Sequence, residues 1–310
     1  MKPSIRTTLG ALFIVAVFSA IAADQPSDWS KPRQPFRIDA NTWYVGTQGL
    51  SAVLITSPHG HVLIDGTLEK NAAQIEANIR ALGFRVQDIR AILNSHAHSD
   101  HAGAIAALAK DSGATVYASA AGAKALELGG ADPEDPQFGL APTYPPLSHV
   151  HVVADGETLH VADLTIVAHY TPGHTPGSTS WTWNACEGNR CHAIAYVDSV
   201  SAISRDGFRY TYDATHPHRV EDFRRSLATI AALPCDVLIT PHPDASDFMD
   251  KVALRDKGTR PDPLIDRHAC AAYAANGLVR LNARLAQENK TKPWRRTLFS
   301  APATPRGLAR

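Results

Sequence analysis

The segment LNSHAHSDHAG, residues 93–103, gathers three histidines and one aspartate within six positions: His96, His98, Asp100 and His101. Imidazole nitrogens and carboxylate oxygens are ligand atoms that zinc takes readily in proteins. Packed together without such a partner they would be poor core material, because each unpaired buried polar group costs about 1–3 kcal/mol. The segment therefore predicts a metal site in preference to an exposed polar loop.

Two further histidines occur directly after predicted strands. His174 lies between two Pro-Gly pairs in TPGHTPGS, a setting that fixes a sharp loop and can present one side chain inward. His242 follows the apolar run CDVLIT and precedes a proline. His169, five residues before His174, is ambiguous, and the remaining histidines lack such a context and are interpreted as ordinary core or surface residues. We therefore add His174 and His242 to the candidate ligands.

The elements around these segments predict how the candidate ligands are positioned. A strand meander precedes residues 69–83, where apolar side chains recur at helical intervals, and residues 86–95 form a strand from whose end the histidine motif follows. Strands dominate again after the middle of the chain, and helices are predicted near residues 220–232 and 263–289. Strands followed by helices, twice over, predict one α/β domain over residues 36–290, made of two similar halves packed sheet to sheet.

Composition limits the class of partner. The chain has 310 residues, 44% of them hydrophobic, which is ample for one large core or two closely packed halves. Thirty Lys and Arg balance 30 Asp and Glu, so that no net charge draws the molecule to nucleic acid or to an anionic membrane. We expect a small-molecule substrate and no nucleic-acid partner.

The two ends of the chain differ from the predicted domain. Residues 1–22 combine a basic start, an apolar run over residues 9–21 and small residues at a cleavage site, a pattern typical of a secretory signal peptide. The apolar run is short for a membrane span, and no cysteine follows that could carry a lipid anchor, so we expect export to the periplasm without a membrane anchor. Residues 23–35 are interpreted as a linker, and residues 291–310 as a basic, frayed tail.

The four cysteines are expected to form disulfides, because an exported protein matures in an oxidising compartment. The segment CEGNRC is a short loop that its own ends can close, which pairs Cys186 with Cys191 and leaves Cys235 with Cys270. A cysteine metal site is disfavoured, since neither spacing is C-x-x-C.

The HAHSDH motif, residues 96–101, resembles the H-x-H-x-D-H signature of the metallo-β-lactamase superfamily, and the resemblance extends from residue 41 to residue 270. It implies an αββα four-layer sandwich with a dizinc site at one edge of the two sheets, in agreement with the doubled pattern of elements. It also implies two sets of zinc ligands, the first being His96, His98 and His174 and the second Asp100, His101 and His242.

The segment AYVDSVSAIS, residues 195–204, bears on the substrate. By resemblance, class B β-lactamases of subclasses 1 and 2 place a zinc-binding cysteine here, glyoxalase-type relatives place a metal-bridging aspartate, and subclass 3 uses a histidine elsewhere. This segment has no cysteine, and the neighbouring segments TPGHTPGSTSWTW (residues 171–183) and ITPHPDASD (residues 239–247) resemble those of subclass 3. Asp198 is either a metal bridge or a structural acceptor for backbone amides beneath the site, and we favour the second interpretation.

The resemblance implies a secreted, monomeric β-lactamase that confers antibiotic resistance. A bridging hydroxide oriented by Asp100 would attack the lactam carbonyl, Ser199 would hydrogen-bond a zinc-bound water, and Ser201 would receive the substrate carboxylate. Side chains from two segments are expected to flank the groove: Trp43, Tyr44, Gln137 and Phe138. The alternatives are another secreted binuclear hydrolase, such as a lactonase or a glyoxalase-II-like thioesterase, and a metal-binding protein without turnover. Export favours the lactamase, because β-lactams act outside the cytoplasm whereas thioester substrates are intracellular.

Overall fold

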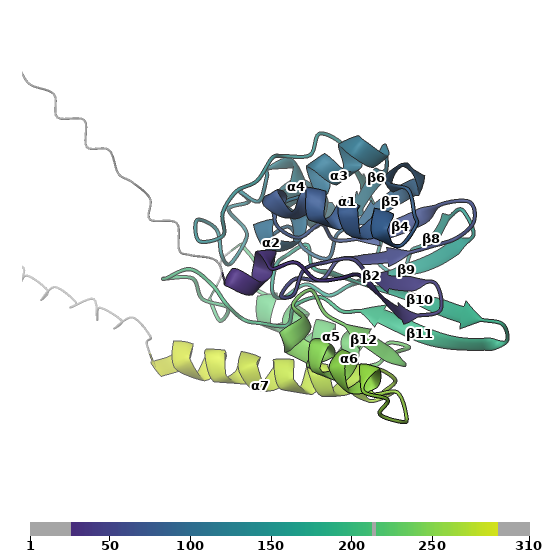
Figure 1. The fold of residues 1–310 in the computed structure, drawn as a ribbon. Helices are drawn as coiled ribbons and strands as arrows, with labels where there is room; N and C mark the ends of the chain where they lie inside the picture. Colours follow the sequence, from purple (N-terminus) through teal and green to yellow (C-terminus); the bar gives the residue numbers. More distant parts are fainter. Residues whose placement is uncertain (1–25, 213–214, 291–310) are drawn as a thin grey trace, which may run out of the picture.

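Two β-sheets lie face to face between two layers of helices (Figure 1). The structure, a computed structural model, describes residues 26–212 and 215–290. The predicted signal peptide and the predicted basic tail fall outside the described residues. Within those residues, every helix is too short or too polar to span a bilayer.

The first sheet has seven strands in sequence order: β1 (Phe36–Asp39), β2 (Thr42–Tyr44), β3 (Val53–Ile55), β4 (His61–Ile64), β5 (Ile89–Leu93), β6 (Thr115–Ala118) and β7 (Val150–Val152). The first four strands pair antiparallel, as the predicted meander requires, and β4 to β7 pair parallel. Parallel neighbours need long crossovers. The helices in these crossovers are α1 (Ala72–Ala81), α2 (Ser99–Ala102), α3 (Ile105–Ser112) and α4 (Ala120–Glu127).

The second sheet has five strands in the order β12-β11-β10-β9-β8. Their bounds are β8 (Thr158–Val161), β9 (Leu164–Tyr170), β10 (Thr179–Glu187), β11 (Arg190–Tyr196) and β12 (Val237–Ile239). Strands β8 to β11 pair antiparallel, and β12 pairs parallel with β11. The helices of this half are α5 (Arg219–Ala231), α6 (Phe248–Asp256) and α7 (Ala269–Lys290).

Three apolar clusters fill the three interfaces between the four layers. The central cluster fills the space between the sheets and includes the fully buried Trp181 and Ile166. The second cluster packs the first sheet against α1, α3 and α4, and the third packs the second sheet against α5 and α7. Figure 1 shows the first helix layer above the strands and α5, α6 and α7 below them. The predicted αββα sandwich is confirmed.

Some element bounds differ from those predicted. The last helix begins at Ala269, because residues 263–268 form turns in which Asp262 and Asp266 accept backbone hydrogen bonds. Short 3-10 helices lie at Ser27–Ser30, Glu69–Asn71, Val86–Asp88 and Pro243–Ser246. The predicted linker is therefore structured from residue 26 onwards.

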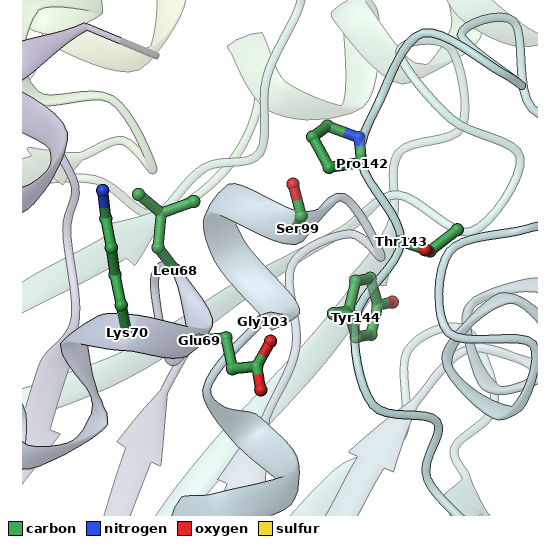
Figure 2. A pocket seen from close by; sticks show the side chains of 8 residues that line it. All are labelled: Leu68, Glu69, Lys70, Ser99, Gly103, Pro142, Thr143 and Tyr144. Carbon is green, nitrogen blue, oxygen red and sulfur yellow. The ribbon is translucent and has the colours of Figure 1, made fainter. Parts of the chain in front are cut away.

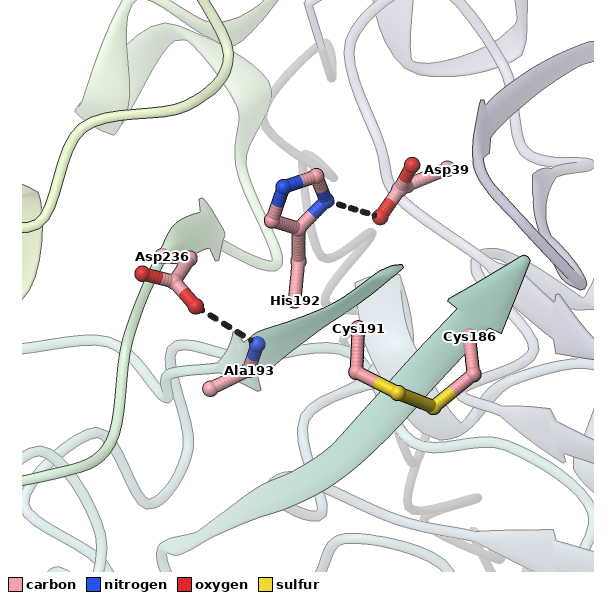
Figure 3. The surroundings of a disulfide bond; sticks show 6 residues. All are labelled: Asp39, Cys186, Cys191, His192, Ala193 and Asp236. Carbon is pink, nitrogen blue, oxygen red and sulfur yellow. Dashed lines mark hydrogen bonds and ion pairs between the residues drawn. A yellow bond between two sulfur atoms is a disulfide. The ribbon is translucent and has the colours of Figure 1, made fainter. Parts of the chain in front are cut away.

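Both predicted disulfides are confirmed. Cys186 and Cys191 are cross-strand partners near the end of the β10–β11 hairpin, and Cys235 joins the segment before β12 to Cys270 at the start of α7. Figure 3 shows the first bridge beside His192, whose Nδ1 lies 2.8 Å from Oδ2 of Asp39 on β1. This contact joins the two sheets at the end of the hairpin.

Candidate metal centre

The HAHSDH segment leaves the end of β5 and runs into the single turn of α2. Asp65, directly after the neighbouring strand β4, holds this segment in place. Its carboxylate accepts hydrogen bonds from the backbone N (2.8 Å) and the hydroxyl (2.6 Å) of Ser95, and from the Tyr196 hydroxyl on β11 (2.8 Å). Burial raises the pKa of Asp65 to about 6. One buried carboxylate thus ties the motif to both sheets.

Gly103, immediately behind the motif, is required by close packing. A Cβ at this position would lie 2.4 Å from the carbonyl oxygen of Ser99 and 2.5 Å from the backbone N of Glu69. Both contacts are with backbone, which cannot move aside as a flexible side chain could. A residue without a side chain therefore lets α2 lie against the 3-10 helix at Glu69–Asn71.

The first cluster contains three buried histidines, His96, His98 and His174. Each offers one ring nitrogen, and the three offered atoms lie within 4.8 Å of one another. The Nε2 atom of His96 is fully buried and has no hydrogen-bond partner within the described residues. An orphaned buried nitrogen facing two other imidazoles is costly without a ligand, so the set fits a metal ion.

The remote ring nitrogens of the first cluster are all held by acceptors. The Nδ1 atom of His96 lies 2.7 Å from Oδ1 of Asp198, and Nε2 of His98 lies 2.8 Å from Oδ2 of Asp135. A third contact joins Nδ1 of His174 to the backbone O and Oγ of Ser201, both at 2.9 Å. Such contacts fix the tautomer and orientation of a metal-binding imidazole.

The protonation of these rings suits metal binding. Burial lowers the pKa of His174 to about 3 and holds the pKa of His96 well below its usual value. Burial alone would raise the pKa of Asp135, but the hydrogen bond and charge of His98, together with the backbone hydrogen bond from Gln137, outweigh burial and the net pKa is lowered. Neutral imidazoles keep the lone pairs that a metal requires, and the carboxylate beside them is ionised.

The second cluster is formed by Asp100, His101 and His242. Oδ2 of Asp100 lies 3.2 Å from Nε2 of His101 and 3.2 Å from Nε2 of His242, and the two Nε2 atoms are 3.1 Å apart. Burial would raise the pKa of Asp100, but the neighbouring His101 and His242 lower it well below its ordinary value. Two ring nitrogens that converge with an ionised carboxylate oxygen also fit a metal ion.

The two clusters adjoin. The offered atoms of His96, Asp100 and His101 also lie within 4.8 Å of one another, so His96 borders both groups. The first half of the chain supplies four of the six side chains from one segment, whereas His174 follows β9 and His242 follows β12. All six side chains meet at one edge of the two sheets.

Asp198 contacts one of the candidate ligand histidines. It is fully buried after the end of β11, and its Oδ1 contacts the ring nitrogen of His96 that points away from the ligand cluster. Burial raises its pKa. The side chain therefore has the structural role favoured from the sequence: it positions His96, and a backbone hydrogen bond from Ser199 offsets part of the rise in its pKa.

A groove of about 840 Å³ lies over the ligand clusters. Its lining includes Ser199, Ser201 and Gln137, as predicted, together with side chains from the N-terminal segment, the loop around residue 140 and α7. These side chains include Trp29, Leu140, Ala141, Pro142, Tyr273 and Arg280, and Ile203 lines the groove as well.

Three predicted wall residues do not line this groove. Tyr44 is fully buried between the sheets, where its hydroxyl donates to the carbonyls of Thr47 and Leu50. Trp43 faces the opposite side of β2 and packs edge-on against Phe84. Phe138 is exposed beside the guanidinium of Arg205 and is absent from the groove lining. The prediction that these side chains flank the groove is wrong.

The N-terminal segment supplies a wall that the sequence analysis missed. The Trp29 ring lies 5.3 Å, centroid to centroid, from the ring of His242. Its backbone is anchored because the side chain of Asn71 donates to the Trp29 carbonyl at 2.9 Å, and the Gly49 N–H donates to the Asp28 carbonyl at 3.0 Å. Trp29 is thus part of the site, and an aromatic residue within the predicted linker was the available signal in the sequence.

A second hollow of about 410 Å³ adjoins the groove and shares Ser99 and Pro142 with it. Figure 2 shows Ser99 between Leu68 on one side and Pro142 on the other, with Tyr144 below. The space over the ligand clusters therefore extends past α2.

The fold and the ligand clusters define a metal-dependent hydrolase. Residues 45–186 match the family described as the metallo-beta-lactamase superfamily. The chain is 46% identical to the Rm3 metallo-beta-lactamase, with a TM-score of 0.82 and coverage of 85% of this chain and 97% of that one. The chain belongs to the metallo-β-lactamase superfamily.

Two other solved structures narrow the resemblance. MEM-A1, a subclass B3 metallo-beta-lactamase from a soil metagenome library, is 46% identical, with a TM-score of 0.82 and coverage of 86% and 100% of the two chains. MIM-1 from Novosphingobium pentaromativorans is 43% identical, with a TM-score of 0.81 and coverage of 88% and 97%. A curated hydroxyacylglutathione hydrolase of Jannaschia sp. (strain CCS1) is 26% identical over 235 residues, 76% of this chain and 78% of that protein. The chain thus resembles subclass B3 more strongly than the thioesterases.

Proposed function

We propose that this protein hydrolyses the amide bond of β-lactam antibiotics with two zinc ions and so confers antibiotic resistance. The observation that carries the proposal is the pair of adjoining ligand clusters beneath a groove of about 840 Å³. The names of the solved relatives, metallo-beta-lactamases at 43–46% identity, support the lactam as substrate.

In the proposed centre, His96, His98 and His174 hold the first zinc, and Asp100, His101 and His242 hold the second. Zinc ions bound there would supply Lewis acidity, which polarises a carbonyl and makes water acidic enough to yield the hydroxide nucleophile near neutral pH.

In this proposal, side chains of the protein bind the substrate and orient the attacking water. Asp100 is ionised, so its carboxylate can accept a hydrogen bond from the attacking water and orient it towards the carbonyl carbon. Ser199 lines the groove and orients a second water by its hydroxyl. The Ser201 hydroxyl oxygen faces Nδ1 of His174 as an acceptor, which leaves its proton for donation to the substrate carboxylate.

Thioester hydrolysis is the second candidate, because two curated relatives, each 26% identical to this chain, are named hydroxyacylglutathione hydrolases. A metal-bridging aspartate at position 198 would favour it. The carboxylate of Asp198 instead contacts the outward nitrogen of His96, which supports the lactamase.

The decisive experiment is a hydrolysis assay with purified, zinc-loaded protein. We expect rapid turnover of a chromogenic cephalosporin, loss of turnover with a chelator, and recovery when zinc is added back. The Asp100→Asn variant should be at least about 100-fold slower, because one change removes both a ligand charge and the water acceptor. Turnover confined to a glutathione thioester or to a lactone would overturn the proposal.

We also propose that the protein acts in the periplasm as a monomer. Two disulfides between described cysteines support an oxidising compartment. Cell fractionation and size-exclusion chromatography with light scattering test the two statements.

A further inference from the structure

Helix α7 lies directly on the segment that follows β11, and Gly277 makes this close approach possible. A Cβ at position 277 would lie 2.9 Å from Cβ and Cγ2 of Val200 and 2.7 Å from a methyl group of Leu227. Four residues earlier, the buried Tyr273 directs its hydroxyl at the carbonyl oxygen of Asp198, 3.4 Å away. One face of α7 is thus seated against residues 198–200, beside the metal ligands.

The same face of α7 carries Arg280 into the groove. Residues seven apart in an α-helix lie two turns apart on one face, so Arg280 follows Tyr273 along the groove wall. Both side chains line the groove, together with Ser201 and Ile203. Burial raises the pKa of Tyr273, and the positive charge of Arg280 offsets part of that rise, as expected of neighbours.

Arg280 differs from the next arginine on its helix. Arg284 is engaged within the fold: its guanidinium donates to Glu288 at 2.8 Å, to the Ser204 hydroxyl at 2.7 Å and to the Phe208 carbonyl at 2.9 Å. Arg280 is exposed, and no hydrogen bond or ion pair joins it to another residue in the described part of the chain. Its guanidinium is therefore available to a ligand.

The charges along the groove make Arg280 distinctive. Among the described lining residues it is the one Lys or Arg, and Asp100, a candidate metal ligand, is the one acid. Another part of the lining is formed by Leu140, Ala141 and Pro142 and carries no charge. An anionic substrate entering this groove therefore meets an uncompensated cation on the α7 wall and apolar groups in that other part of the lining.

We propose that Arg280 binds the carboxylate of the substrate and thereby sets the direction in which the substrate lies in the groove. The assignment rests on the proposed function and names the group of the β-lactam that this wall recognises. A guanidinium offers two parallel N–H donors that match a carboxylate, an arrangement that the single hydroxyl of Ser201 cannot supply. The substituent at the other end of the substrate then points towards Leu140, Pro142 and the adjoining hollow.

The test compares Arg280→Ala, Arg280→Lys and a matched control, Lys290→Ala, which removes a positive charge from the same helix outside the groove lining. Each zinc-loaded variant is assayed with a cephalosporin as the free acid and as its methyl ester. For Arg280→Ala we expect KM for the acid to rise about tenfold, because the loss of one hydrogen bond between charged groups weakens binding by about that factor. We expect kcat to stay nearly unchanged. KM for the ester should stay as in wild type, Arg280→Lys should recover part of the loss, and Lys290→Ala should change neither.

Salt provides a second readout. Raising ionic strength should increase KM for the acid in wild type and not in Arg280→Ala, because only the former uses a charge attraction. Equal changes for acid and ester, or no change for either, would overturn the assignment while leaving the proposed function intact. Failure of wild type to hydrolyse either compound would overturn both.

Discussion

The two ligand clusters differ in how firmly the fold holds them. In the first cluster every histidine is buried, and each remote ring nitrogen contacts an acceptor within 2.9 Å; the acceptors are Asp198, Asp135 and Ser201. Acceptors of this kind orient the ring before a metal arrives and make its other nitrogen a stronger donor. The first cluster is thus set up for a metal by the fold itself.

The second cluster lacks that support. The side chain of His242 is 30% exposed, and its neighbours are Asp100, His101 and the Trp29 ring. The Nδ1 atom of His101 is buried, and within the described chain it has no hydrogen-bond partner. Two clusters that draw on the same motif are therefore not supported equally by the fold. We predict that the first cluster binds zinc more tightly than the second.

The largest expected effect follows from removing a ligand from each cluster in turn. His174→Ala should lose the tighter zinc and hydrolysis with it, whereas His242→Ala should keep one zinc at the first cluster. Elemental analysis after gel filtration distinguishes the two variants, with far-UV circular dichroism as the check on folding. Loss of both ions in His242→Ala would show that the clusters are a single unit and break the comparison.

A smaller effect is expected from removing the acceptors behind the first cluster. Asp198→Asn and Asp135→Asn should each weaken the tighter zinc by about 10- to 100-fold, since such positioning partners contribute about that much to metal affinity. Both variants should still bind two ions at saturating zinc. Asp163→Asn, on an exposed turn paired with His59, is the control and should bind as wild type. Failure of Asp198→Asn to hold two ions at saturation would instead indicate a metal-bridging carboxylate.

The ligands could be predicted from the sequence because four of them lie within one six-residue segment. The motif at residues 96–101 carries its spacing with it, and His174 and His242 stand in recognisable contexts after strands. The doubled order of strands and helices likewise predicted the sandwich, since local periodicity shows which elements form and how many layers they need.

The supporting residues could not be predicted in this way, because their contacts join distant segments. Asp198 is 102 positions from His96, and Asp135 is 37 positions from His98, so no local pattern pairs them. Trp43 and Tyr44 illustrate a related difficulty. Adjacent strand residues face opposite sides, and only the position of the second sheet decides that one is central core and the other packs under the helices.

Competitive zinc titration of the metal-free protein against a fluorescent chelator tests the central claim most directly. We predict two resolved steps of one ion each, with the tighter step weakened in Asp198→Asn and the weaker step lost in His242→Ala. Two indistinguishable steps, or a tighter step that responds to His242→Ala and not to Asp198→Asn, would contradict the account of one firmly held cluster and one loosely held cluster.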